Sequence, residues 1–595
     1  GEQNVAMGYK ALFTNSTGDN NVAIGHVALH TIAGADNNTA VGTVSGYSVT
    51  TASGSAFLGY QAGRSVSTGN DNIAIGNSAM YGGTVTGDNN IAIGVSAGDA
   101  LTSGINNILM GTDAGGAITT GGSNVIIGTE AGDGFTANTT MTLIGYQAGT
   151  TINSNNANGT VAVGYLSLGA LTGGAENTAL GSRSGDAATN ASGSVFLGFD
   201  AGGTVTTGNR NIAIGLDAMN GGATTGDNNI AIGAKSGDAL TSGKENVLIG
   251  ADAGGAANSA TDTVAVGHNT LSGLTTGAQN VAIGAGALGT TDDGQQNTAI
   301  GHASMALGNI GNSNTAVGGQ TLLYCTNSNN TAVGMQASQF LVGGAYNVSL
   351  GIWAARYVNG SATGNVSLGA GALMDAKEGA SNADVDFNIA IGYGALNGGT
   401  LAADNDLIGN IAIGYNAFKS TGTQNHVGTI AIGYNALTAV TSGSDNVAIG
   451  YEAGVALTTS DYNILIGAGA GLEMVAGSNR NTIIGYEAFA QTGGGASTNN
   501  TYIGLQSGGG DHAGTSTYNV GVGEQSLYGA HNDVQKNSAL GYRALYACRT
   551  GDNNVGIGYQ AGNAITTGGG HVIIGSDSDP SAGNTSNEIV IGYNA

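Results

Sequence analysis

A glycine recurs along this chain at a nearly constant spacing, directly after an apolar residue. The first three of these anchor glycines are Gly8, Gly25 and Gly42, the last is Gly592, and most are 17 residues apart. The 34 anchors divide the 595 residues into 34 repeats. Helical repeats need about 33 residues or more, so a period this short suits one coil of short strands and turns. The sequence therefore predicts an all-β chain, a parallel β-solenoid (β-roll) of about 34 turns with a 17-residue period.

The residues before the anchor predict how each coil packs. Position −1 is Ile, Val, Leu or Met in every repeat, and position −3 is mostly Val, Ile or Thr. These two positions share one strand face, because side chains alternate along a strand, and we expect that face to line the core. Position −2 is mostly Ala and never Asp, Glu, Lys, Arg, Asn or Gln.

A strand that is apolar on both faces is buried on both. We therefore expect position −2 to face outward and to pack against other copies of the chain, most simply in a homotrimer with its solenoids side by side. The alternative is a flattened coil that buries both faces internally. Position +3 is Ala, Ser or Thr in all 34 repeats, which predicts tight packing between successive turns.

Asparagine occupies position −4 in 26 of the 34 repeats. Stacked turns would place these amides in a ladder, each bonded to the next, which fixes the strand register. The alternative is that the Asn and Asp of "GDNN" bind Ca²⁺, although the calcium-binding nonapeptide pattern is not reproduced. The ladder residues that we single out are Asn4, Asn21, Asn38, Asn72, Asn90 and Asn229.

We expect 1–595 to be a single continuous solenoid shaft. The segments 25–163 and 164–302 repeat each other at an offset of 139 residues, as two copies of an eight-turn block. The segment 370–413 holds two turns with long loops, where the anchor spacing rises to 23 and 22 residues. Both chain ends lie inside a repeat, so we expect this chain to be part of a longer protein.

The long loops gather acidic side chains. Insertions in solenoids emerge on one face, often the binding face, and carboxylates are the ligands that Ca²⁺ prefers. We favour a tolerated surface insertion, with a Ca²⁺ site as the alternative and no other cofactor expected. The candidate ligands are Asp375, Glu378, Asp384, Asp386, Asp404 and Asp406.

The two cysteines, Cys325 and Cys548, lie seven residues after an anchor, where other repeats often carry an apolar residue. We therefore expect them to be buried as small hydrophobes rather than paired in a disulfide. The loop "GGGDHAG" sets Asp511 beside His512, but two ligands are too few for a typical metal site, and a solvated turn is favoured.

The charge balance excludes several function classes. With 13 basic and 38 acidic residues, the formal net charge is −25, which repels nucleic acid and anionic lipid. No run of 18 apolar residues predicts a membrane span. The sequence "GVSAG" fits the nucleophile elbow of hydrolases at Ser96, but it sits in an ordinary repeat without triad partners. We therefore expect no enzyme, with a polysaccharide-degrading activity as the least favoured alternative.

The repeat resembles the head repeats of trimeric autotransporter adhesins, whose motif is close to Asn-Ser-Val-Ala-Ile-Gly followed by a small residue. The matching stretches include "NNVAIGHVAL" (20–29), "NTAVG" (38–42), "NIAIG" (72–76) and "NVAIGYEAG" (446–454). Similar repeats occur in phage tail fibres. The resemblance implies three β-rolls side by side, an extracellular location on a cell surface or virion, and a fibrous attachment role toward a host or cell-surface glycan or receptor. A self-assembling extracellular filament is the rival interpretation.

Overall fold

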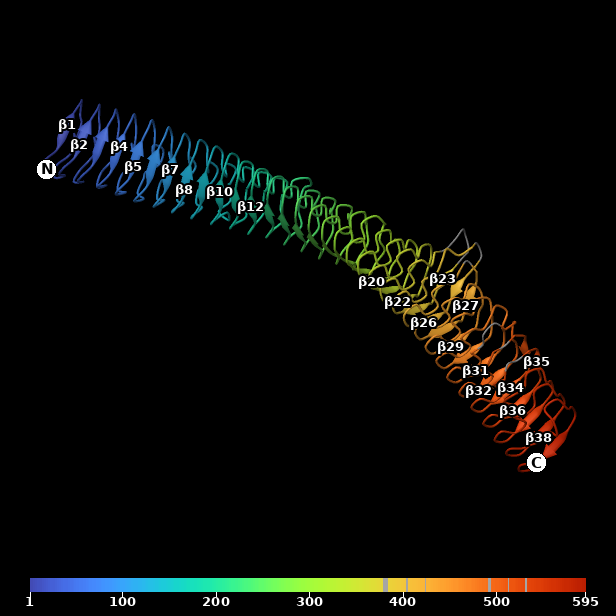
Figure 1. Cartoon of the computed structure of the whole chain (residues 1–595). Coiled ribbons are helices and arrows are strands. Elements are labelled where there is room, and N and C mark those ends of the chain that lie inside the picture. The colour runs from blue at the N-terminus through green and yellow to red at the C-terminus, as the bar shows by residue number, and fades with distance from the viewer. Residues whose placement is uncertain (378–383, 403–404, 423, 491–493, 512, 530–531) are drawn as a thin grey trace. The chain divides into compact units, whose positions relative to one another are not determined.

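A computed structural model describes residues 1–377, 384–402, 405–422, 424–490, 494–511, 513–529 and 532–595. These residues form strands and turns with no helix. The chain divides into two compact units, Gly1–Gln295 and Gln296–Ala595, and within each unit the turns stack one on the next (Figure 1). The prediction of an all-β parallel solenoid of about 34 turns is confirmed.

Each turn of the first unit contributes one three-residue strand that ends directly before its anchor glycine. These strands are β1 (Val5–Met7), β2 (Val22–Ile24), β3 (Thr39–Val41), β4 (Ala56–Leu58), β5 (Ile73–Ile75), β6 (Ile91–Ile93), β7 (Ile108–Met110), β8 (Val125–Ile127), β9 (Thr142–Ile144), β10 (Val161–Val163), β11 (Thr178–Leu180), β12 (Val195–Leu197), β13 (Ile212–Ile214), β14 (Ile230–Ile232), β15 (Val247–Ile249), β16 (Val264–Val266) and β17 (Val281–Ile283).

The second unit repeats this arrangement with the strands β18 (Thr298–Ile300), β19 (Thr315–Val317), β20 (Thr331–Val333), β21 (Val348–Leu350), β22 (Val366–Leu368), β24 (Ile389–Ile391), β26 (Ile411–Ile413), β28 (Ile430–Ile432), β29 (Val447–Ile449), β30 (Ile464–Ile466), β31 (Thr482–Ile484), β32 (Thr501–Ile503), β34 (Val520–Val522), β36 (Ser538–Leu540), β37 (Val555–Ile557), β38 (Val572–Ile574) and β39 (Ile589–Ile591).

Successive strands within a unit pair in parallel with no register shift. Val22, Ala23 and Ile24 of β2, for example, lie beside Val5, Ala6 and Met7 of β1. Each column of the sequence repeat is therefore a row of side chains along the stack.

Three longer turns of the second unit carry an additional short strand. These are β23 (Val385–Asp386), β25 (Leu407–Ile408) and β27 (His426–Val427), which form a small parallel sheet of their own. A second such pair consists of β33 (Ser516–Thr517) and β35 (Val534–Gln535). The sequence predicts loops for the first two of these insertions. In each of the five short strands the first residue is buried, and this burial holds the inserted segment against the coil.

The strand faces are reversed relative to the sequence prediction. Position −2 is buried in every anchor strand except the terminal β1 and β39, whereas positions −1 and −3 are exposed or half-buried in all of them. The flattened-coil alternative is also excluded, because positions −1 and −3 are not covered by the chain's own described residues.

The interior of the coil is closely packed and lined mainly by small side chains. In the turn anchored at Gly76, Ala74, Ala79, Met80 and Val85 are all fully buried, and alanine is the commonest residue at position −2. Where Phe57 occupies position −2, it fills its layer so completely that a methyl group on Gly63 would lie 2.1 Å from its ring. Position −2 therefore faces the core, where branched residues such as Ile126 are buried as well as alanine.

Candidate functional site

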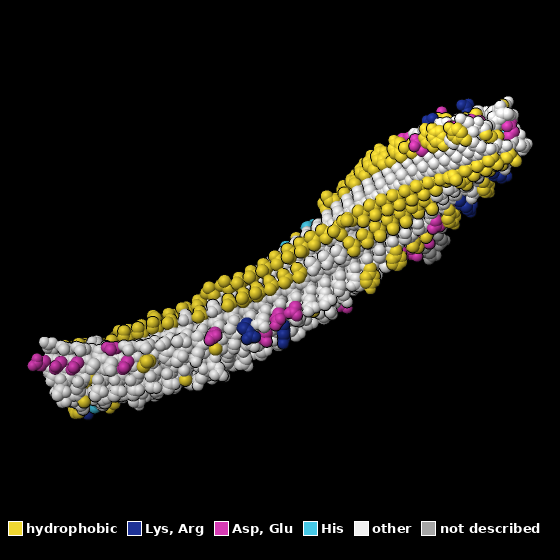
Figure 2. Space-filling model, turned by 90° about the horizontal axis from the view of Figure 1, so that it is seen from below, with side chains coloured by type: hydrophobic (Ala, Val, Ile, Leu, Met, Phe, Trp, Pro, Cys, Tyr) yellow, Lys and Arg dark blue, Asp and Glu magenta, His cyan; other side chains and the backbone are white. Residues whose placement is uncertain are grey.

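Within each unit the outward strand face is an uncharged, mostly apolar surface, which we call the apolar stripe: positions −3 and −1 of the anchor strands of that unit. None of these side chains is buried, and Leu58, Leu180 and Leu540 are each about half exposed. No Asp, Glu, Lys or Arg occurs at either position. Figure 2 shows hydrophobic side chains gathered in long bands on one face. Monomeric soluble proteins rarely expose apolar patches beyond a few hundred Å², and larger ones mark interaction sites.

An aromatic column runs beside the stripe at position +1. Tyr393, Tyr415, Tyr434 and Tyr451 stack in succession, with ring centroids 5.4, 5.1 and 5.2 Å apart. Their exposed fractions lie between 44% and 60%, so the column is a surface feature. The spacing follows from the unshifted register, because each ring lies over the ring of the previous turn.

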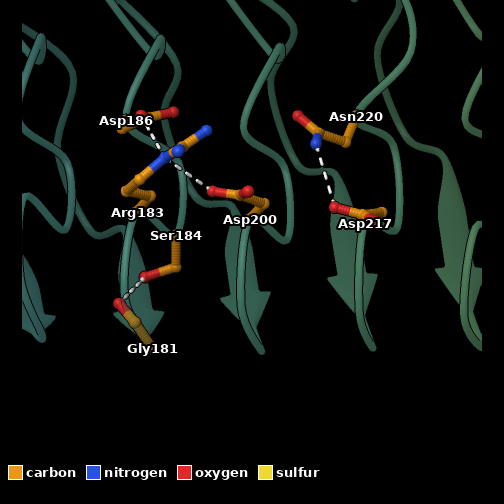
Figure 3. A network of polar contacts seen from close by, with 7 residues as sticks. All are labelled: Gly181, Arg183, Ser184, Asp186, Asp200, Asp217 and Asn220. Carbon is orange, nitrogen blue, oxygen red and sulfur yellow. Dashed lines mark hydrogen bonds and ion pairs between the residues drawn. The ribbon is translucent and has the colours of Figure 1, made fainter.

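Position +2 forms a polar column on the outside of the coil. Figure 3 shows Arg183 between Asp186 of its own turn, 3.5 Å away, and Asp200 of the next turn, 2.8 Å away. Burial raises the pKa of Asp200, and Arg183 opposes that shift. Asn220 donates to Asp217 over 3.2 Å in a later turn. Only the Arg183–Asp200 pair joins successive turns, and the other two contacts lie within one turn.

The asparagines at position −4 bond to the turns on both sides. The backbone N–H of Asn90 donates to Oδ1 of Asn72 over 2.9 Å, and Nδ2 of Asn90 donates to the same oxygen over 3.1 Å. Nδ2 of Asn90 also donates to the carbonyl of Gly104 over 2.9 Å. The same bonding pattern recurs, in part or in full, at Asn4, Asn21, Asn38, Asn72 and Asn229. These side chains are therefore occupied within the fold.

His571 takes the place of an asparagine in this ladder, which the sequence analysis missed. Its backbone N–H donates to Oδ1 of Asn554 over 3.0 Å, and its Nε2 lies 2.8 Å from the carbonyl of Thr585. Its Nδ1 accepts from the backbone N–H of Glu588 over 3.3 Å. Both ring nitrogens therefore reproduce the bonding of an asparagine amide. The position of His571, four residues before Gly575, was the available signal.

A second ladder at position −6 was also missed. Oδ1 of Asp88 accepts from the backbone N–H of Asn70 in the previous turn over 2.7 Å, and Asp227 does the same for Asn209. In "GDNN" the Asp therefore caps the preceding turn and the final Asn bonds to its neighbours in the stack. The Ca²⁺ alternative for this motif would have to displace these bonds.

Two of the acidic candidates of the long turns accept hydrogen bonds from neighbouring backbone, and three of them lie near one another. Oδ1 of Asp386 accepts from the backbone N–H of Thr363 over 2.6 Å, and Oδ1 of Asp406 accepts from that of Asp384 over 3.2 Å. Burial, reinforced by Asp384 and Asp406, raises the pKa of Asp386. The backbone N–H of Asp375 donates to Asn397.

The other acidic candidates, Glu378 and Asp404, lie outside the described residues, as does His512 of the Asp511–His512 pair. Among the residues that the structure describes, no three His, Cys, Asp or Glu side chains are grouped as a metal site requires. Asp384, Asp386 and Asp406 therefore contact backbone groups or lie near one another, and the described contacts do not form a coordination sphere.

Both cysteines are fully buried and unpaired, as predicted. Burial raises the pKa of the thiol to about 11 for Cys325 and about 12 for Cys548. The thiolate is the reactive form. We expect neither thiol to react with an aqueous aromatic disulfide reagent at pH 8 while the chain is folded, and both to react in denaturant. Rapid reaction of one thiol in the native protein would contradict this packing.

The scan against family models finds no match to this sequence, and the search of curated proteins finds no relative. In the described part of the chain, no helix has the length and apolar character needed to cross a membrane.

Proposed function

We propose that this chain is the shaft segment of an extracellular fibrous attachment protein, of the kind found in phage tail fibres or cell-surface adhesins. In this proposal three copies lie side by side and bury their apolar stripes against one another. The role is mechanical: a stiff stack of turns projects an attachment module, and the partner is a host or cell-surface glycan or receptor.

The apolar stripe of each unit carries this proposal. A stable interface takes about 800 Å² from each partner, and within each unit successive turns present partly exposed Ile, Val, Leu, Met and Thr side chains without one charged side chain. A partner with apolar rows at the same spacing is another copy of the chain. The proposed interface is therefore formed by positions −3 and −1, and not by position −2 as the sequence predicts.

Solution mass tests the assembly directly. We expect light scattering or sedimentation to give three times the chain mass of 57.8 kDa. A mass of one chain at micromolar concentration would overturn the proposal, and a stable two-chain species would overturn the trimer.

A matched pair of variants tests which face is buried in the assembly. Ile75→Glu and Ile93→Glu together place two charges in the stripe on β5 and β6, whereas Thr68→Glu places one on an exposed turn. We expect the stripe variant to need a higher chain concentration for assembly, or to bind a hydrophobic dye, because buried unpaired charges are costly. Thr68→Glu should leave both readouts unchanged. An equal response of the two variants would argue against the stripe as the interface.

The self-assembling filament remains the second candidate, and end-to-end growth would distinguish it. Electron microscopy of the purified chain should show particles of one length if the chain is a shaft segment. Particles that lengthen with concentration would favour the filament.

A further inference from the structure

In the second unit, a pocket of about 450 Å³ lies at the end of the aromatic column that begins at Tyr393. At position +1, Ile352 and Tyr393 are two turns apart, and the turn between them carries only the methyl group of Ala370. With strands about 4.8 Å apart, the gap between the two side chains is about 10 Å. Gly371 and Gly394 at position +2 leave the floor open. We call this feature the ring slot.

One face of an aromatic ring is turned toward the slot. Tyr393 stacks on Tyr415 with an interplanar angle of 11°, which covers one of its faces. Its other face is directed along the stack toward the turn of Ala370, and Tyr393 makes no second ring contact within the part of the chain that the structure describes. Tyr393 and Trp353, which also lines the slot, are 60% and 41% exposed. A single flat ring inserted over Ala370 would continue the column.

The rim of the slot is polar and carries one positive charge. Asn397, Asn416 and Lys419 line it together with the apolar side chains. Oδ1 of Asn416 is buried against Gly394 and accepts no hydrogen bond from the described residues. A buried acceptor without a donor is costly, and a ligand hydroxyl at the slot would supply the donor after a small rotation of this side chain.

We propose that the ring slot binds one carboxylate-bearing sugar ring of an anionic glycan. The apolar C–H face of the sugar would stack on Tyr393, its hydroxyl groups would bond to the two asparagines, and its carboxylate would pair with Lys419. A purely aromatic ring would provide no hydroxyl donor for Asn416. The positive charge is informative because the chain as a whole is strongly acidic.

A second slot in the same unit provides a natural control. Ala468 and Gly469 occupy the same two positions between Tyr451 and Tyr486, and their pocket has about 140 Å³. The rim there carries Glu452 and Glu487 instead of a lysine. The two glutamates repel a carboxylate. An acidic sugar should therefore bind to the ring slot and not to this second slot, although both have Ala and Gly at the same repeat positions.

Trp353 is the only tryptophan of the chain, so its fluorescence reports on the ring slot alone. The probes are the methyl glycosides of glucuronic, galacturonic and sialic acid, with methyl glucoside and methyl galactoside as neutral counterparts. We expect at least one acidic glycoside to give a saturable change, about tenfold tighter than every neutral one, because a charge-assisted bond is added. Equal binding of acidic and neutral glycosides, or no binding by any acidic one, would overturn the assignment.

Two variants and a control locate the binding. Ala370→Tyr fills the slot with the residue that many other turns carry at position +1, and it should abolish the response. Lys419→Gln should weaken acidic glycosides about tenfold and leave neutral ones unchanged. Ala468→Tyr fills the second slot and should change nothing. Retention of binding by Ala370→Tyr would contradict the assignment.

This inference deepens the attachment function proposed above and rests on it for the class of partner. The solution mass of the same samples separates the two. A single-chain mass with tight acidic binding would remove the trimer and keep the slot. A trimer in which binding appears only after Ile75→Glu and Ile93→Glu loosen the assembly would assign the slot to the interface and overturn it as a glycan site.

Discussion

Replacing Gly250 by alanine is expected to destabilise the first unit by more than about 3 kcal/mol, as one of the largest single-residue effects in the chain. Gly250 has a φ of +133°, and a methyl group there would lie 2.4 Å from the carbonyl oxygen of Gly267 in the next turn. A left-handed backbone costs a non-glycine residue about 1–3 kcal/mol. The backbone clash adds to this cost, because the turns cannot separate without breaking the ladders on both sides.

Gly255→Ala is the matched control from the same turn. The nearest atom to a methyl group at Gly255 is the carbonyl oxygen of Asp252 at 3.5 Å, and its φ is not positive. Alanine there should stabilise by up to about 1 kcal/mol, since it restricts the unfolded chain. Chemical denaturation followed by circular dichroism measures both variants. Opposite signs are expected, and similar losses would show that glycine content rather than anchor geometry sets the stability.

The anchor column explains why so much of the fold could be predicted. All 34 anchor glycines have φ between +124° and +159°, so each repeat needs glycine at this one position. A side chain there would clash with the anchor glycine of the next turn: a methyl group at Gly94 would lie 2.2 Å from the carbonyl oxygen of Gly111. Such a requirement leaves a visible mark in the sequence. The strand before each anchor follows directly from it.

The direction of the strand faces could not be predicted in the same way. Both faces of "IAI" are apolar, and in a strand of three residues alternation shows only that the central side chain opposes the outer two. The packed interior buries Ala74 at position −2 and leaves Ile73 and Ile75 half-buried on the outside. Position −2 also holds the buried Phe57 and Ile126 in other turns, so neither the size nor the polarity of one side chain predicts which face turns inward.

The ring slot and the inner strands of the long turns were missed for different reasons. The sequence "GAGA" occurs at 369–372 and 467–470, where the slots lie, but also at 284–287, and an alanine at position +1 has meaning only once Tyr393 is known to stack along the axis. The strand β23 is two residues long, and its partner lies 22 residues away. Pairs this short carry no periodic signal, so only the stacking of successive turns defines them.

Replacing Asn229 by alanine is the second substitution for which we expect a large effect, a loss of about 3–5 kcal/mol. The side chain is fully buried. Its Oδ1 accepts from both the backbone N–H and Nδ2 of Asn246, over 3.2 and 2.9 Å, and its Nδ2 donates to the carbonyl of Gly243 over 2.9 Å. Alanine leaves these buried groups in the next turn without their partners, and each unpaired group costs about 1–3 kcal/mol.

Two further substitutions separate bonding from bulk in this ladder. Asn229→His should recover part of the loss, because His571 accepts and donates at the same position of another turn. Asp227→Asn keeps the acceptor that caps the backbone N–H of Asn209, and it should change stability by less than about 0.5 kcal/mol. Hydrogen exchange at the amide of Asn246 gives the local readout. It should be fastest in Asn229→Ala, intermediate in Asn229→His and unchanged in Asp227→Asn. Exchange as slow in the alanine variant as in the parent chain would mean that the backbone ladder alone holds the turns together.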